Sequence, residues 1–246
     1  MKRVALSFVL AGVLLAACSS ESGDQVFVSA AASLTDAFAS LESAFEESHP
    51  DIDVILNLGG SSALREQILA GAPADVFASA NQPNMSVVAD SGLVSGEAVI
   101  FATNRLEIAV PSGNPAGVIG LEDFGNPDLV IGLCSGVVPC GDFARRALES
   151  ADVRPSVDTD EPNVRALLTK IEAGELDAGI VYATDVVARG GLVEGIPIDA
   201  AHNVPAGYPI AVLNSGNNQD DALTFVGFVM STIGRQILLD HGFELP

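Results

Sequence analysis

The stretch VFVSAAASLTDAFASLESAFEESHPDIDVILNLGG, residues 26–60, carries the pattern that determines the fold class. Its first five residues are apolar or small and are typical of a buried strand. A helix is predicted at residues 33–48, because apolar side chains recur there at helical spacing: Leu34, Phe38, Leu41 and Phe45. The apolar run at residues 52–58 predicts a second strand. A strand, a helix and a strand in this order are typical of an α/β protein with parallel sheets.

The same alternation continues from this stretch to the C-terminus. Further strands are expected at residues 76–78, 106–110, 129–133, 179–182 and 210–213. Further helices are expected at residues 62–70, 83–91, 141–150, 163–173, 219–231 and 232–240. The strand at residues 106–110 is interpreted as the crossover into a second lobe. In open α/β sheets a ligand binds beyond the carboxyl ends of the strands, where helices begin.

The N-terminus has the order of features of an exported lipoprotein. Two basic residues open the chain, and the apolar run after them is too short to span a bilayer, which takes about 20 residues. The run ends in LAAC, residues 15–18, which resembles the lipobox of bacterial lipoproteins, where cleavage precedes a cysteine that receives lipid. Residues 1–17 are therefore predicted to be a signal peptide, Cys18 a lipid-anchored residue and residues 18–24 a flexible tether. An ordinary signal peptide cut elsewhere and an uncleaved core helix are the alternatives.

The charge of the chain restricts its partners. The 246 residues include 11 Lys and Arg against 32 Asp and Glu. Removal of residues 1–17 takes away two basic residues, which leaves nine against 32 and a net charge of −23. Such a surface repels nucleic acid, and the sequence has no basic stripe with interleaved aromatic residues. An anionic ligand remains compatible with this charge, because salt screens surface charge within about 8–10 Å.

Two of the three cysteines flank a short loop. Cys134 and Cys140 enclose residues 135–139, and outside the cytoplasm such a pair can oxidise. We predict a disulfide between them, worth about 2 kcal/mol by loop closure; two free buried thiols are the alternative. A metal site is not expected, because no histidine has zinc-ligand spacing from these cysteines.

Four loops place small or polar groups at the starts of predicted helices. They are AAAS (residues 30–33), GGSS (59–62), VPCG (138–141) and EPNV (161–164). Each leaves backbone N–H groups without a partner at the positive end of a helix, which is a favourable place for an anion. The alternative is that the serines, Ser33, Ser61 and Ser62, are only N-caps. The residues alone leave both interpretations open.

From residue 25 to its end, the chain resembles the periplasmic molybdate-binding proteins of ABC transporters. The resemblance rests on motifs that occur in the same order: AASLT (31–35), SSALR (61–65), GAPADVFASA (71–80), VPCG (138–141), NVR (163–165), GIVY (179–182) and HGF (241–243). The segment at residues 71–80 is the most specific of them. The chain departs from the family at Cys140, where alanine is usual. Only the backbone is used at that position, so the expected role survives.

This resemblance implies a two-lobe type II periplasmic-binding-protein fold, with a mostly parallel sheet flanked by helices in each lobe. Residues 25–104 and 205–246 would form the first lobe and residues 105–204 the second, with the ligand in the cleft and closure by a hinge motion. The oxyanion would be bound by the hydroxyl and N–H groups of Ser33 and Ser61, the N–H groups of Cys140 and Val164, and the phenol of Tyr182. For Tyr182, a hydroxyl satisfied within the core is the alternative.

Molybdate is the expected ligand, and tungstate is expected to bind as well. Molybdenum would enter only as the bound oxyanion, with no cofactor. The protein would act as a monomer that delivers its ligand to an ABC transporter permease. Sulfate or another tetrahedral oxyanion is the near alternative. A surface lipoprotein with a vestigial cleft, acting as an interaction module, is a further one.

A hydrolase on the same scaffold, using Ser33 or Ser61, is a weaker alternative. It would need a base, and neither His49 nor His202 lies in a matched loop. The GxSxG motif, a P-loop and GxGxxG are absent from the sequence. We therefore expect a binding protein and not an enzyme.

Three charged residues lie near the expected anion loops. Arg65 and Arg165 are interpreted as surface or helix-capping residues, and Asp75 as a carboxylate that braces its loop.

Overall fold

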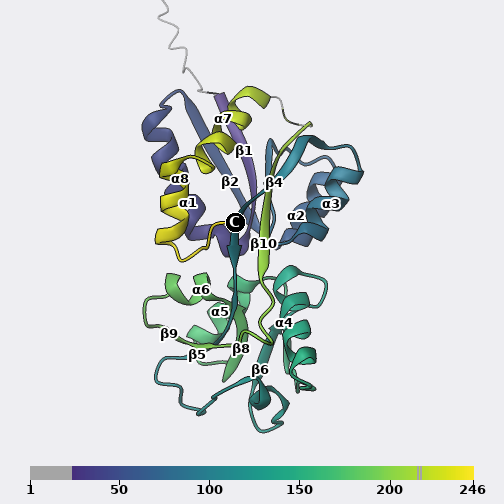
Figure 1. Ribbon diagram of the computed structural model, residues 1–246, viewed down its shortest axis with the longest axis vertical. Coiled ribbons are helices and arrows are strands. Elements are labelled where there is room, and N and C mark those ends of the chain that lie inside the picture. The colour runs from purple at the N-terminus through teal and green to yellow at the C-terminus, as the bar shows by residue number, and fades with distance from the viewer. Residues whose placement is uncertain (1–23, 215, 217) are drawn as a thin grey trace, which may run out of the picture.

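The computed structural model describes residues 24–214, 216 and 218–246. The chain forms two lobes that follow one another along the longest axis, each built on a single five-stranded sheet with helices packed around it (Figure 1). This arrangement confirms the predicted two-lobe α/β fold. The predicted signal peptide and Cys18 lie outside the described residues.

The sheet of the first lobe has the strand order β2-β1-β3-β10-β4. Its strands are β1 (Asp24–Ala31), β2 (Ile52–Gly59), β3 (Val76–Ala78), β4 (Val94–Asn104) and β10 (Ala206–Leu213). Its helices are α1 (Thr35–Ser48), α2 (Ser61–Leu69), α3 (Gln82–Asp90), α7 (Gln219–Val229) and α8 (Thr232–Asp240), with a 3-10 turn at Ala32–Leu34 before α1. The strand β10 is antiparallel to both of its neighbours, and the other four strands share one direction.

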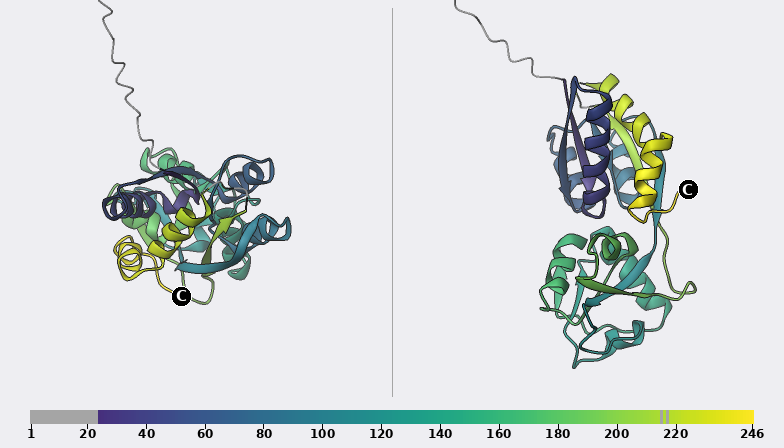
Figure 2. Two further views of the ribbon diagram at one scale, coloured as in Figure 1. Left: turned by 90° about the horizontal axis from the view of Figure 1, so that it is seen from above. Right: turned by 90° about the vertical axis from the view of Figure 1, so that its left-hand side faces the viewer.

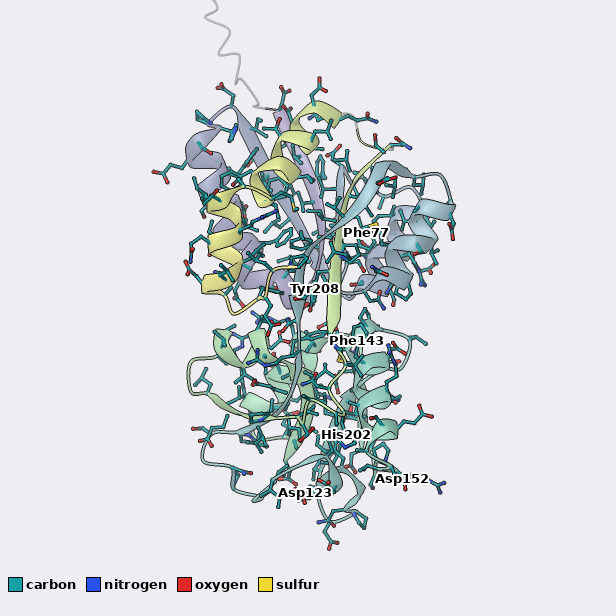
Figure 3. All side chains as sticks on the ribbon, in the orientation of Figure 1. Phe77, Asp123, Phe143, Asp152, His202 and Tyr208 are labelled. Carbon is teal, nitrogen blue, oxygen red and sulfur yellow. A yellow bond between two sulfur atoms is a disulfide. The ribbon has the colours of Figure 1, made fainter. Side chains whose placement is uncertain are left out.

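Alternate side chains of β3 show how the two faces of this sheet are buried. Val76 and Ala78 belong to the large apolar cluster that includes Phe38 of α1. Phe77 lies on the opposite face, in a second cluster with Leu64 of α2 (Figure 3). A strand buried on both faces reads as a continuous apolar run, which is why this segment was identifiable from sequence.

The sheet of the second lobe has the order β7-β6-β8-β5-β9. Its strands are β5 (Leu106–Pro111), β6 (Ile131–Cys134), β7 (Thr159–Glu161), β8 (Ala178–Tyr182) and β9 (Val193–Pro197). Its helices are α4 (Pro139–Ser150), α5 (Val164–Glu172) and α6 (Ala183–Ala188), with a 3-10 turn at Leu121–Gly125. Here β5 is the single reversed strand. Each sheet is thus mostly parallel, as expected, with one antiparallel strand beside its parallel core.

Two extended segments connect the lobes, one from β4 into β5 and one from β9 into β10, and both lie on the same side of the molecule (Figure 2). Asn203 ties them together. Its Oδ1 accepts from the Leu106 N–H at 2.9 Å, and its Nδ2 donates to the Leu106 carbonyl at 2.8 Å. The segments therefore form a paired connection and can act as a hinge.

All of the elements expected from sequence are present, within a few residues of the expected bounds. Helices α2, α3 and α5 are followed by Gly71, Gly92 and Gly174 at φ values of 85°, 73° and 70°, which glycine adopts readily. The first helix begins later than expected, because the 3-10 turn takes up Ser33 and Leu34. Sequence reasoning missed β4, β7, β9 and α6.

Among the residues described, no single helix is long and apolar enough to cross a membrane, and only the pair α7 and α8, bent by 59°, passes such a test together.

Candidate functional site

The carboxyl ends of the parallel strands of the two sheets face each other, and a small cavity lies between them. Its lining residues end β1 or β8 or stand in the loops and helix starts that follow β1, β2, β3, β6 and β7: Ala31, Ala32, Ser33, Gly60, Ser61, Ala80, Val138, Pro139, Cys140, Asn163, Val164 and Tyr182. All five residues expected to bind an oxyanion are among them. The cavity has a volume of about 20 Å³, somewhat more than the ~10–15 Å³ that one water requires.

The first lobe contributes two serine hydroxyl groups to this cavity. Neither Ser33 nor Ser61 caps a helix, because Gly60 is the N-cap of α2 and no side-chain cap bond is formed at either start. Ser61 Oγ accepts from the Ala80 N–H at 3.0 Å. Its own proton therefore remains free to be donated into the cavity. Ser33 Oγ lies 2.9 Å from the Tyr208 hydroxyl.

Ser62, the third candidate cap, also has a different role. Its hydroxyl donates to the Val137 carbonyl of the second lobe at 2.6 Å. Gly60 beside it is close to the second lobe as well, since an added Cβ would lie 2.9 Å from the Pro162 carbonyl oxygen. A side chain at Gly60 would therefore hold the lobes apart.

The second lobe contributes two helix starts. Helix α4 has Val138 as its N-cap, and Pro139 stands at the first helical position, where a missing N–H costs nothing. The Cys140 N–H follows at the cavity wall. Helix α5 begins at Val164, and the Asn163 side chain caps it by accepting from the Ala166 N–H at 3.0 Å. The N–H groups of Cys140 and Val164 have no acceptor within their helices and lie at the positive ends of the helix dipoles.

A disulfide holds the loop before α4. The structure joins Cys134 at the end of β6 to Cys140, with their Cα atoms 5.8 Å apart. Gly141 packs against the same loop so closely that an added Cβ would lie 2.4 Å from the Cys134 carbonyl oxygen. The backbone at Cys140 is therefore fixed from two sides.

Tyr182 ends β8 and is only 1% exposed. Its hydroxyl oxygen has no hydrogen-bond partner among the described residues. This favours the ligand-binding interpretation over a hydroxyl satisfied within the core. Burial raises the pKa of Tyr182 well above its ordinary value, with the nearby Tyr208 and Asp185 as further causes. The phenol is a neutral donor at the cavity wall, and a ligand oxygen would supply the missing partner.

Within the part of the chain that the structure describes, no charged side chain lines the cavity. Arg65 donates to Asn84 Oδ1 at 2.9 Å and pairs with Glu66 on the surface, in agreement with its interpretation. The interpretation of Arg165 was wrong, because its guanidinium crosses between the lobes and binds both carboxylate oxygens of Asp36 on α1, at 2.9 and 3.2 Å.

Asp75 braces its loop, as expected. Its Oδ2 accepts from the Phe27 N–H of β1 at 2.7 Å. The carboxylate thereby ties the start of β3 to the neighbouring strand and takes no part in the cavity.

Several direct hydrogen bonds join the two lobes, so the structure has them closed against each other. Besides the bonds of Ser62 and Arg165, Asn104 Nδ2 donates to Thr184 Oγ1 at 2.8 Å. Sequence reasoning found neither of these residues, nor Tyr208 and Asp185. Each is buried, yet none lies in a motif with a local pattern that would have marked it.

Neither histidine that could serve a hydrolase lies at the cavity. His49 stacks on Phe45, and its Nδ1 lies 2.9 Å from Ser48 Oγ at the end of α1. His202 Nδ1 lies 2.9 Å from Ser150 Oγ. Among the described residues, no group of three or more His, Cys, Asp or Glu side chains is arranged to hold a metal ion. The cavity can bind a small anion with neutral donors from both lobes.

Comparison with known proteins agrees with this geometry. Residues 26–244 match the family model described as bacterial extracellular solute-binding protein. The molybdate-binding protein ModA of Mycobacterium tuberculosis is 36% identical over 221 residues, which cover 90% of this chain and 85% of that protein.

Two solved structures share the fold. The periplasmic molybdate-binding protein of Azotobacter vinelandii superposes with a TM-score of 0.78 at 19% identity, over 90% of this chain and 99% of the other. The sulfate-binding protein SubI of Mycobacterium tuberculosis superposes with a TM-score of 0.81 at 17% identity, over 90% and 87%.

Proposed function

Because this chain belongs to the bacterial extracellular solute-binding proteins, we propose that it captures molybdate outside the cytoplasm and delivers it to the permease of an ABC transporter. The observation that carries the proposal is a small cavity between the lobes whose polar groups include neutral donors from both of them. The mycobacterial relative named for molybdate binding supports the choice of ligand. Tungstate, which has the same shape and charge, should bind the same donors.

The donor set suits a fully deprotonated oxyanion. A dianion that leaves water without a counter-charge is costly unless its oxygens are hydrogen-bonded, and bonds to charged acceptors are the strong class. Ser61 can donate its proton, because its oxygen already accepts from Ala80. Tyr182 gains its first partner when a ligand oxygen arrives. A protonated oxyanion would bring a further donor to a wall that already consists of donors.

We assign five ligand-binding residues on this basis. Ser33 and Ser61 would bind through hydroxyl and backbone N–H groups, Cys140 and Val164 through backbone N–H groups, and Tyr182 through its phenol. Two lobes share the ligand, so binding and closure are coupled. We place the division between lobes at residues 25–104 with 205–246 against residues 105–204, and the hinge at the crossovers tied by Asn203.

The family places the protein outside the cytoplasm. We propose that it stays at the membrane through lipid on Cys18, with residues 1–17 removed and residues 18–24 as a tether, and that it works as a monomer. The sequence LAAC at residues 15–18 supports the anchor. Metabolic labelling with a lipid precursor tests it, because labelling should disappear in Cys18→Ala.

Sulfate is the second candidate ligand, since a sulfate-binding protein shares the fold. Sulfate has the charge and shape of molybdate and is smaller, so the size of the closed cavity should discriminate between them. Calorimetric titration of residues 24–246 with molybdate, tungstate, sulfate and phosphate tests both candidates. Tight one-to-one binding of molybdate and tungstate supports the proposal. If only sulfate binds, sulfate is the ligand in place of molybdate. If none of the four anions binds, the protein is not an oxyanion receptor.

The role of Tyr182 has a test of its own. Because its hydroxyl has no protein partner, Tyr182→Phe should leave the stability of the ligand-free protein unchanged or raise it. The same variant should bind molybdate more weakly by about 1.5–3 kcal/mol, the range for a hydrogen bond to a charged group. If Tyr182→Phe binds molybdate with unchanged affinity, Tyr182 does not bind the ligand.

A further inference from the structure

Tyr208 lies in β10 at the level where the two lobes meet (Figure 3). It is fully buried. Its ring packs edge-to-face against Phe101, Tyr182 and Phe243, at centroid distances of 6.5, 5.9 and 5.4 Å. This aromatic surrounding fixes the ring, so the hydroxyl has one position, and that position is 2.9 Å from Ser33 Oγ.

The direction of the hydrogen bonds around Tyr208 follows from Asn104. The Arg105 N–H donates to Asn104 Oδ1 at 3.0 Å, which fixes the oxygen of the amide. The amide nitrogen therefore faces the other way, where it donates to Thr184 Oγ1 and also lies 3.5 Å from the Tyr208 hydroxyl oxygen.

The Asn104 amide thus directs an N–H at the Tyr208 hydroxyl oxygen, so the Tyr208 O–H must donate its proton to a different acceptor. Burial raises the pKa of Tyr208, so the phenol keeps that proton. Ser33 Oγ, at 2.9 Å, is the oxygen with which the Tyr208 hydroxyl forms its short hydrogen bond, so Ser33 is the acceptor. Once Ser33 accepts from Tyr208, its own proton points away from Tyr208 and is available to the cavity that Ser33 lines.

We propose that Asn104 and Tyr208 are positioning residues that orient Ser33 as a donor toward the bound oxyanion. The hydrogen bonds run in one direction, from the Asn104 amide through the Tyr208 phenol to the Ser33 hydroxyl and the ligand. The inference rests on the proposed function and adds a determinant of specificity. Tyr208 occupies an acceptor position of Ser33 Oγ, which makes Ser33 a poorer partner for the proton of hydrogen phosphate.

Tyr208→Phe removes the relay and keeps the aromatic packing. Molybdate affinity should fall about three- to tenfold, the effect of losing one orienting, polarising bond. The affinity for phosphate should fall by a smaller factor, so the ratio of molybdate affinity to phosphate affinity should decrease. In a Ser33→Ala background the same substitution should have no further effect on affinity, because the relay acts only through Ser33.

Asn104→Asp provides a test in the opposite direction. An aspartate accepts where the amide donated, so Tyr208 would donate to it and Ser33 would in turn donate to Tyr208. Molybdate affinity should fall more than in Tyr208→Phe. Adding Tyr208→Phe should then restore part of the loss by releasing Ser33. Asn203→Asp, which adds the same charge beside the crossover without touching the relay, serves as the control and should show no such restoration.

Calorimetry on the purified protein measures all of these affinities, and thermal unfolding reports whether each variant is folded. Wild-type affinity in folded Tyr208→Phe, or an equal loss with and without Ser33, would overturn the inference. So would a further loss when Tyr208→Phe is added to Asn104→Asp. If the wild-type protein itself binds no molybdate, the proposed function fails first, and this inference fails with it.

Discussion

Replacement of Asp185 by asparagine should stabilise the protein at pH 8 and have little effect at pH 4. Asp185 stands in the first turn of α6 and is 1% exposed. Its Oδ2 accepts from the Tyr182 N–H at 3.1 Å, while its Oδ1 has no partner among the described residues. Asparagine has the same shape and can still accept that N–H, so the substitution changes mainly the charge.

The magnitude follows from the pKa of Asp185, which is raised from 3.8 to about 7. Burial is the main cause, and Asp36 adds to it, whereas the Tyr182 N–H, Arg165 and Arg189 act in the opposite direction. At a pH between 3.8 and about 7, Asp185 keeps its proton in the folded protein and has lost it in the unfolded chain. The free energy of unfolding therefore falls as the pH rises from about 4 to 7, by about 4 kcal/mol at most, and levels off above that.

Urea denaturation of both proteins at pH 4, 5, 6, 7 and 8 measures this effect. The free energies of unfolding should be similar at pH 4, and Asp185→Asn should become the more stable protein as the pH rises, by about 1–2 kcal/mol at pH 5 and about 3–4 kcal/mol at pH 8. Other groups with a shifted pKa are common to both proteins and cancel in the difference. The exposed Asp128→Asn serves as the control and should show no such trend. A difference that stays constant with pH, or a more stable wild type at pH 8, would refute the reasoning.

Three further predictions concern the cavity and its walls. Ser61→Ala should weaken molybdate binding by about 1.5–3 kcal/mol, and an effect no larger than that of the exposed Ser86→Ala in calorimetry would exclude Ser61 from the site. Cys134 and Cys140 should be oxidised in the exported protein, so that intact mass is unchanged by alkylation without reductant; two added alkyl groups would show free thiols. Arg165→Gln removes the partly exposed ion pair with Asp36, which is worth up to about 1 kcal/mol, so molybdate affinity should fall up to about fivefold. Small-angle scattering should then show a more open ligand-free protein. If the separation of the lobes is unchanged, the ion pair does not hold them closed.

Sequence reasoning succeeded where a segment is buried on one or both faces. The first helix has Phe38 and Phe45 on its buried face, and its apolar spacing is unambiguous. It failed at β4, an edge strand that is exposed at residues 96–99 and in which Gly96 interrupts the pattern. It also failed at β7, which has only the three polar residues Thr159–Glu161, because such a strand depends on pairing with β6.

The candidate site divides in the same way. Ser61, Cys140 and Val164 stand in the first turns of helices, so a local motif is enough to mark them. The groups that orient these donors are brought together only by the fold. Ser33 and Tyr208 are 175 residues apart in sequence, and no local pattern relates them. Sequence could therefore predict which groups face the ligand, but not what fixes their direction.

The place of β10 in the first sheet has a consequence for the order in which the chain folds. The ribosome completes β1, β2, β3 and β4 long before β10, yet β10 is the strand that joins β3 to β4. Until residue 213 has been made, this lobe consists of two separate pieces with open strand edges, which are prone to pair with other chains. The second lobe is encoded by one continuous stretch and can form first. A chain that stops before β10 would therefore carry one finished lobe and one that cannot close, and would be a target for proteolysis and aggregation.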